Sequence, residues 1–262
     1  MPTTTAPDGS TIAYEVEGSG PPLVLVHGLS ADRRELDPIV ERLAPEFTCV
    51  RLDLRGHGKS EAARTAHDVF SMAGDVAAVV GATGVGAPLI IGHSMGGMVA
   101  TIYAASGEPV RGVVNVEQPL RMVDFAAIVR PFEDALRGPE FHEIFGSFIA
   151  ALGVDVLPPE VAARVRANSQ TIRPEVVLDV WGPLFTATDD ELTALVEADM
   201  LAKIRVPYLV LHGSEPGDDY RAWLTGVMPT ATIEVWEGDQ HWLHLVEPDR
   251  FSDRIRDLNA TI

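Results

Sequence analysis

Apolar positions along the first half of the chain recur in two alternating rhythms. Short runs rich in β-branched and other apolar residues alternate with longer segments whose apolar residues recur every three to four positions. The first kind of run is typical of buried strands and the second of amphipathic helices. The pattern predicts strands at 11–17, 23–27, 48–53, 88–92 and 112–117, and helices at 33–43, 67–82 and from the turn at Ser94 to about residue 105. Such alternation is typical of a mostly parallel sheet with helices on both faces.

The alternation of predicted strands and helices ends after residue 117. From Gln118 to Arg205 the chain shows only helix-length segments, punctuated by proline and glycine. These predicted helices lie at about 123–137, 140–151, 158–168, 174–185 and 189–200. The simplest explanation is a helical insertion between two strands of one sheet.

Strands return after the insertion, at 206–211 and 231–236, and a final amphipathic helix carries Phe251, Ile255 and Leu258 on one face. The predicted fold class is therefore α/β. We expect a core built from two stretches of chain, with a helical cap between them. The predicted domains are the core at 1–117 and 206–262 and the cap at 118–205.

Composition narrows the range of partners. The 262 residues include 46% hydrophobic ones, as in an ordinary globular protein, and carry a net charge of −18. A surface this acidic repels nucleic acid and anionic lipid, so we expect neither as a partner. No apolar stretch of about 18 residues predicts a membrane span, and the N-terminus lacks the pattern of a secretory signal. The lone cysteine, Cys49, lies in an apolar run and suits the core of a cytoplasmic protein. Assembly as a homodimer is left open.

The sharpest motif is GHSMG at 92–96, which matches G-x-S-x-G. It follows a predicted strand and opens a predicted helix, which is the context that a nucleophilic serine of this type requires. Small residues two positions either side of Ser94 let the chain turn tightly, so the hydroxyl stands exposed above the sheet. The N–H of Met95 lies at the helix N-terminus, where the helix dipole favours an oxyanion. The motif predicts a serine hydrolase.

Two further loops follow predicted strands at the same sheet edge. After 23–27 comes Gly28, whose turn can aim the Leu29 N–H at the same oxyanion. The segment 53–60 (DLRGHGKS) ends like a phosphate-binding loop, but Asp53 stands where the first glycine of that motif belongs. We therefore interpret it as a structural loop and expect no nucleotide. The sequence spacing also reveals no metal-ligand cluster, so we expect neither metal nor organic cofactor.

Together, LVLVHG, DLRGHGKS and GHSMGG occur in the order and spacing that resemble the α/β-hydrolase superfamily. The resemblance covers most of the chain and implies the α/β-hydrolase fold, a mostly parallel sheet flanked by helices with an inserted cap. It also implies a chain order of serine, acid, histidine. By that order the base follows the last strand, where His241 stands, and His244 is its rival.

The catalytic acid is ambiguous in the sequence. In most members of the superfamily it follows the strand after the cap as Gly-x-x-Asp, but here that slot holds Pro216. The nearby Asp218 and Asp219 are out of register. Glu117, at the end of the strand before the cap, offers a second solution. Its position resembles that of the acid in the fungal zearalenone lactonases, and we favour it over Asp218 and Asp219.

The predicted cap is rich in large apolar residues, which favours a covered apolar pocket above Ser94. We expect Trp181, Gly28 and Trp242 to contact the substrate. The preferred function is hydrolysis of an ester or lactone of a hydrophobic small molecule through an acyl-enzyme. The alternatives are a C–C bond hydrolase or cofactor-free oxygenase on the same scaffold, and a hydrolase-like receptor that binds a ligand without rapid turnover.

Overall fold

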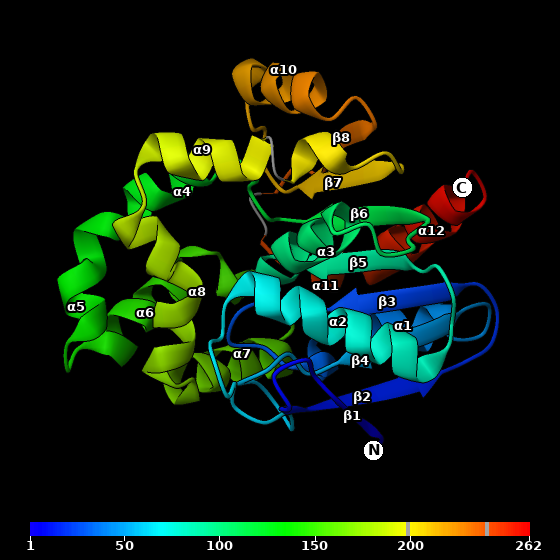
Figure 1. Ribbon diagram of the computed structural model, residues 1–262, viewed down its shortest axis with the longest axis horizontal. Helices are drawn as coiled ribbons and strands as arrows, with labels where there is room; N and C mark the ends of the chain where they lie inside the picture. The colour runs from blue at the N-terminus through cyan, green and yellow to red at the C-terminus, as the bar shows by residue number, and fades with distance from the viewer. Residues whose placement is uncertain (198–199, 239–240) are drawn as a thin grey trace.

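The computed structural model describes residues 1–197, 200–238 and 241–262. Within these ranges the strands form one eight-stranded sheet, ordered β1-β2-β4-β3-β5-β6-β7-β8 (Figure 1). The strands are β1 (Thr3–Thr5), β2 (Thr11–Glu17), β3 (Pro22–Val26), β4 (Thr48–Leu52), β5 (Leu89–His93), β6 (Gly112–Val116), β7 (Tyr208–His212) and β8 (Ala231–Val235). Strand β2 pairs antiparallel with β1 and β4, and every pairing from β4 to β8 is parallel. The predicted α/β fold with a mostly parallel sheet is confirmed.

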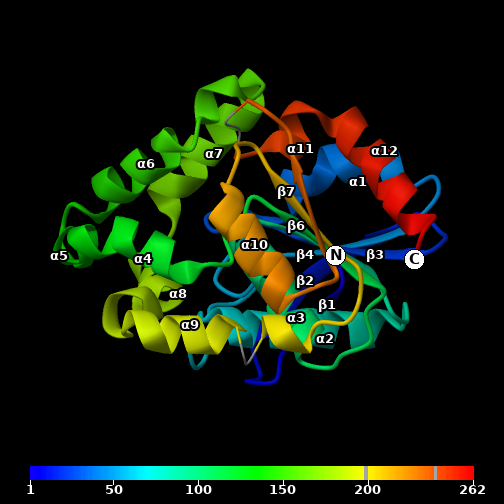
Figure 2. The ribbon, with the colours of Figure 1, turned by 90° about the horizontal axis from the view of Figure 1, so that it is seen from above.

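Helices cover both faces of the sheet, because strands β3, β5, β6 and β7 present apolar side chains on each face. On one face lie α2 (Val69–Thr83), α3 (Met95–Ala105) and α10 (Asp218–Val227), and on the other lie α1 (Asp37–Leu43), α11 (Leu243–Val246) and α12 (Pro248–Asn259) (Figure 2). A short 3-10 turn, η1 (Arg33–Leu36), leads into α1. The two layers enclose separate cores on the two sides of the sheet.

Between β6 and β7 the described chain is helical. The elements are α4 (Met122–Val129), η2 (Arg130–Phe132), α5 (Glu133–Arg137), α6 (Phe141–Ala151), η3 (Val154–Val156), α7 (Pro159–Thr171), α8 (Pro174–Thr186), α9 (Asp189–Glu197) and η4 (Leu201–Lys203). We call α4 to α9 the helical insertion. It gathers beside the sheet, at the left of Figure 1, and packs around its own apolar core, with Phe145, Val176 and Val177 fully buried.

Several elements differ from the predicted pattern. The helix predicted at 123–137 is broken, because Pro131 has no N–H to continue the helical hydrogen bonds and the chain forms a 3-10 turn there. Strand β1 and helix α10 were not predicted. Helix α10 carries Tyr220, Trp223, Leu224 and Val227 at the spacing of an amphipathic helix, a pattern that the sequence analysis overlooked. The described residues contain no helix with the length and hydropathy needed to cross a membrane.

Candidate active site

The turn between β5 and α3 holds Ser94 in a strained conformation. Its backbone lies at φ 51° and ψ −127°, in a region that residues with a β-carbon rarely adopt. The flanking glycines make the turn possible. A β-carbon on Gly92 would lie 2.0 Å from the Gly96 carbonyl oxygen, and one on Gly96 would lie 2.4 Å from the Val26 carbonyl oxygen. The Ser94 N–H donates to the Val116 carbonyl at 2.8 Å, which ties the turn to β6.

The loop after β3 lies directly against this turn. A β-carbon on Gly28 would be 3.3 Å from the Ser94 β-carbon and 3.1 Å from His93 Nδ1. Leu29 follows Gly28, and Met95 begins α3, where the first amides of a helix have no acceptor within the helix. Gly28, Leu29, Ser94 and Met95 all line one cavity. The two predicted oxyanion residues are thus brought together with the serine.

Glu117 lies one residue beyond β6 and is itself in the left-handed region, at φ 57°. Its carboxylate accepts the Gly213 N–H, and it lies 3.7 Å from His212 Nδ1 and 3.8 Å from His241 Nδ1. Burial by itself would raise the pKa of Glu117. The contacts with the two imidazoles and the Gly213 amide outweigh burial and hold the pKa at about 2. Glu117 is therefore ionised at neutral pH.

His241 begins the last described stretch of chain and lines the same cavity as Ser94 and Glu117. Burial lowers the pKa of His241, the Glu117 carboxylate acts in the opposite direction, and His93 lowers it further. The net shift is downward, so the imidazole is neutral at pH 7 and able to accept a proton. Because Nδ1 faces the carboxylate, the proton of the neutral ring belongs on Nδ1, which leaves Nε2 as the acceptor.

The rival acids and the rival base lie elsewhere. Asp218 and Asp219 are exposed in the first turn of α10. Within the described part of the chain, neither makes a hydrogen bond or ion pair with His241. Glu215 instead pairs with Arg221 at 2.7 Å. His244 is fully buried in α11, on the side of the site that faces Glu35. Of the candidate acids, only Glu117 approaches His241 within the part of the chain that the structure describes.

Sequence reasoning did not assign roles to His212, Gly213 or Glu35. His212 ends β7, beside the strand that ends before Glu117, so the rule that active-site residues follow parallel strands could have drawn attention to it. Glu35 gives no such signal, because an acidic residue in a segment of helical periodicity is ordinarily solvated. It is nevertheless 4% exposed.

The cavity has a volume of about 460 Å³ and is mostly apolar. The sheet edge and the helical insertion both contribute to its wall. The predicted substrate-binding residues Gly28, Trp181 and Trp242 all line it. Trp181 packs against three phenylalanine rings of the insertion, Phe125, Phe145 and Phe148, at centroid distances of 5.6, 5.7 and 5.6 Å. Trp181 thus belongs both to the core of the insertion and to the cavity wall.

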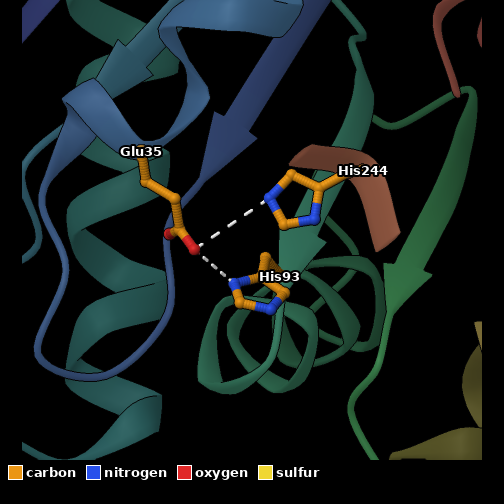
Figure 3. Close-up of side chains that lie close together, drawn as sticks. All are labelled: Glu35, His93 and His244. Atoms are coloured by element: carbon orange, nitrogen blue, oxygen red, sulfur yellow. Dashed lines mark ion pairs between the residues drawn. The ribbon is translucent and has the colours of Figure 1, made fainter. Parts of the chain in front are cut away.

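Three buried side chains meet beside the nucleophile turn in a way that spacing along the chain did not reveal. Glu35 Oε1 lies 2.6 Å from His93 Nδ1 and 4.0 Å from His244 Nε2 (Figure 3). All three could offer a ligand atom, within 4.8 Å of one another, to a metal ion. The expectation of no metal-ligand cluster considered sequence neighbours alone, whereas the fold assembles this cluster from three distant segments.

Comparison with known proteins agrees with this architecture. A sequence model described as the alpha/beta hydrolase family matches residues 23–254. A non-heme chloroperoxidase of Streptomyces lividans is 30% identical over an alignment of 271 residues, which covers 95% of this chain and 96% of the relative. A thermophilic esterase from Thermogutta terrifontis superimposes with a TM-score of 0.77 at 25% identity, over 99% of this chain and 97% of that one. An enzyme described as degrading N-acyl homoserine lactones has a TM-score of 0.80 at 24% identity, over 98% and 99% of the two chains, a likeness of fold alone.

Proposed function

The chain belongs to the alpha/beta hydrolase family, and we propose that it is a serine hydrolase that cleaves an ester or lactone of a hydrophobic small molecule. In this proposal Ser94 is the nucleophile, His241 the base and Glu117 the acid. The observation that carries it is the approach of the Glu117 carboxylate to His241 Nδ1, at 3.8 Å, in a cavity that Ser94 also lines. An imidazole oriented by a carboxylate beside a strained serine that opens into a cavity is the arrangement that activates a hydroxyl.

The reaction proceeds in two steps. Ser94 Oγ attacks the substrate carbonyl while its proton passes to His241 Nε2, and the N–H groups of Leu29 and Met95 stabilise the negative charge on the carbonyl oxygen. The tetrahedral intermediate collapses, the C–O bond breaks, and the leaving alcohol takes the proton from His241. Water then attacks the acyl-enzyme and gives one proton to His241, which passes it to Ser94 Oγ as the bond between Oγ and the acyl carbon breaks and the carboxylic acid leaves.

Glu117 acts through His241. Its carboxylate faces the Nδ1–H of the neutral ring, which keeps the proton on Nδ1 and leaves Nε2 unprotonated and turned to the hydroxyl. When His241 becomes an imidazolium, the nearby negative charge stabilises it. The low pKa of Glu117 supports this role, because a carboxyl group that stayed protonated would supply no charge.

The cavity supports the substrate class. Its walls are mainly apolar, and a volume of about 460 Å³ suits a small molecule rather than a polymer chain. We assign the predicted cap, residues 118–205, the role of covering Ser94, with Trp181 and Trp242 contacting the apolar part of the substrate. An aryl ester or aryl lactone fits these walls best, because indole rings pack on planar rings.

The test is turnover of p-nitrophenyl esters and aryl lactones, zearalenone included, by the wild type and Ser94→Ala. We expect the wild type to give an acid and an alcohol, and the variant to lose at least about 10³-fold in kcat/KM. Ser106→Ala, at the far end of the same helix, is the matched control and should retain activity. An active Ser94→Ala, or a wild type inert on the whole panel, would contradict the proposal. Parallel assays reveal the other chemistries: cleavage of ketone substrates, oxygenation of aromatic substrates in air, and peroxide-dependent chlorination.

A further inference from the structure

A buried acid–histidine pair lines the same cavity as Ser94 without a role in the proposed chemistry. Glu35 belongs to η1, on the approach to α1, and His93 ends β5 immediately before Ser94. Both side chains are at most 5% exposed, and Glu35 Oε1 lies 2.6 Å from His93 Nδ1 (Figure 3). Burying a carboxylate and an imidazole together is costly unless they neutralise one another, so the pair needs an explanation.

The protons of the pair follow from its neighbours. His93 Nε2 lies 2.9 Å from the backbone carbonyl oxygen of His241. A carbonyl can only accept, so His93 Nε2 carries a proton. Glu35 Oε1 lies 2.6 Å from His93 Nδ1, although the contact lacks the direction of a hydrogen bond. An ionised carboxylate this close to the ring is repelled by a lone pair on Nδ1 and attracted by an imidazolium, so the contact favours a His93 that is protonated on both nitrogens.

The geometry favours a proton over a metal ion in this place. Two ligands of a tetrahedral zinc ion, each about 2.0–2.1 Å from the metal, lie roughly 3.3 Å apart. Glu35 Oε1 and His93 Nδ1 are 2.6 Å apart, which is too close for such a pair. The third candidate ligand, His244 Nε2, is 4.0 Å from Glu35 Oε1.

The pair connects three of the segments on which the proposed reaction depends. Glu35 Oε2 accepts the Gly28 N–H at 3.0 Å and so fixes the loop that carries Leu29. His93 donates to the carbonyl of His241 and so fixes the loop that carries the base. His93 is also bonded to the nucleophile, Ser94. A single ion pair therefore anchors the oxyanion loop, the nucleophile turn and the base loop to one another.

We propose that Glu35 and His93 form a buried ion pair that positions the oxyanion loop and His241 and tunes the proton affinity of His241. This inference rests on the proposed function, because it assigns His241 as the base. Glu35 and His93 are positioning residues, since neither reaches the substrate carbonyl in the mechanism above. The matching contact on the other side of His241 comes from Glu117.

The charges around His241 give the direction of the effect. His93 faces it from β5, with ring centroids 4.7 Å apart, and Glu117 faces it from the end of β6, beside His212 of β7. Glu35 and the neutral, buried His244 lie behind His93. The His93 cation lowers the pKa of His241 more than the Glu35 anion raises it. The ion pair therefore keeps the base neutral at lower pH.

Two substitutions separate charge from anchoring. In Glu35→Gln the amide oxygen can still accept the Gly28 N–H and the amide NH₂ can donate to a neutral His93, so the loops stay fixed and the charges disappear. We expect the plateau kcat to stay within about threefold, while the acid limb of kcat/KM moves up by about 0.5–1 pH unit. Glu35→Ala removes both anchors, and we expect kcat to fall by about 10- to 100-fold at all pH values, with a smaller change in KM.

The controls distinguish positioning from loss of fold. Rates are expressed per serine labelled by a fluorophosphonate, so that unfolded protein does not contribute to the count of active sites. The control variant Glu234→Gln removes an ion pair with Arg254 away from the site, and it should leave both the rate and the pH profile unchanged. The proposal is wrong if Glu35→Ala retains the wild-type kcat per labelled serine, or if the profile of Glu35→Gln superimposes on that of the wild type.

A second measurement needs no substrate and so separates this inference from the proposed function. The ¹⁵N NMR signals of the imidazole rings should show His93 protonated on both nitrogens at pH 7 in the wild type, and on one in Glu35→Gln. If the wild type hydrolyses nothing but shows the doubly protonated ring, the ion pair stands and the assigned reaction fails. A singly protonated wild-type His93, or a stoichiometric bound metal found by elemental analysis, would overturn the ion pair itself.

Discussion

Replacing Glu117 by glutamine is the substitution that best tests the proposed acid, because it changes charge with almost no change in shape. A glutamine can still accept the Gly213 N–H through its amide oxygen. Its NH₂ group then faces His241 Nδ1, where the carboxylate oxygen stood 3.8 Å away. An amide NH₂ donates and cannot accept, so it favours the ring tautomer whose proton is on Nε2. That tautomer cannot take the proton of Ser94.

The size of the effect follows from the two roles of the carboxylate. The wrong tautomer and the loss of charge beside the imidazolium together predict a fall in kcat of about 10²–10⁴-fold, with little change in KM. The carboxylate also contributes to stability. Its pKa falls from 4.5 to about 2 on folding, which corresponds to about 3 kcal/mol at neutral pH.

The sign of the pH dependence is fixed by the direction of that shift. Because the folded-state pKa is depressed, the contribution is complete above pH 4.5 and is lost as the pH falls from 4.5 through about 2. In urea unfolding, the wild type should therefore lose up to about 3 kcal/mol over this window relative to Glu117→Gln. The two proteins should be most alike in stability at the acid end.

The matched control is Asp218→Asn, which neutralises an exposed acid in the first turn of α10. We expect its steady-state kinetics to match those of the wild type within about twofold, because the substitution lies on the surface, away from the site. The reasoning is refuted if Asp218→Asn loses more activity than Glu117→Gln, or if Glu117→Gln retains more than about a tenth of the wild-type kcat.

The remaining predictions concern the turn and the cavity wall. Gly96→Ala should lower the free energy of unfolding by about 1–3 kcal/mol in urea titrations, because its β-carbon would meet the Val26 and His27 carbonyl oxygens at 2.4 and 2.6 Å. The control, Gly81→Ala, adds a β-carbon that meets nothing within 4 Å and should be neutral or stabilising. Equal costs for the two substitutions would contradict this reasoning. Trp181→Ala should raise KM for aryl esters about tenfold more than for acetyl esters, in a steady-state comparison with Phe185→Ala, which lies on the same helix α8 outside the cavity lining. Equal effects of these two substitutions would remove Trp181 from the proposed substrate contacts.

Much of this protein can be predicted from local sequence. The period of the apolar residues predicts the parallel sheet and the helical insertion, because backbone geometry ties each period to one kind of element. The motif around Ser94 is equally local, since the glycines that a tight strand-to-helix turn requires stand within two residues of it. Helix α10 was overlooked although Tyr220, Trp223, Leu224 and Val227 have helical spacing, and Pro131, in the middle of the segment 123–137, was a signal for the break that the structure shows there.

The choice among the acids was open in the sequence, and it depends on packing between distant segments. Glu117 approaches His241 because β6 ends beside β7 and the last loop returns over both, whereas Asp218 begins an exposed helix. Register within a sheet and the path of a loop are decided by contacts across the chain. The resemblance of the acid position to zearalenone lactonases stays a prediction.

The sequence by itself determined the α/β class, the turn that exposes Ser94 and the region in which its base belongs, because each depends on residues close together in the chain. Only the tertiary structure decided that Glu35 meets His93 beside that turn, and that Glu117 rather than Asp218 faces His241. The physical reason is that a buried charge is stable only beside a partner. In both cases the partner comes from a distant segment of the chain, where no local pattern can reveal it.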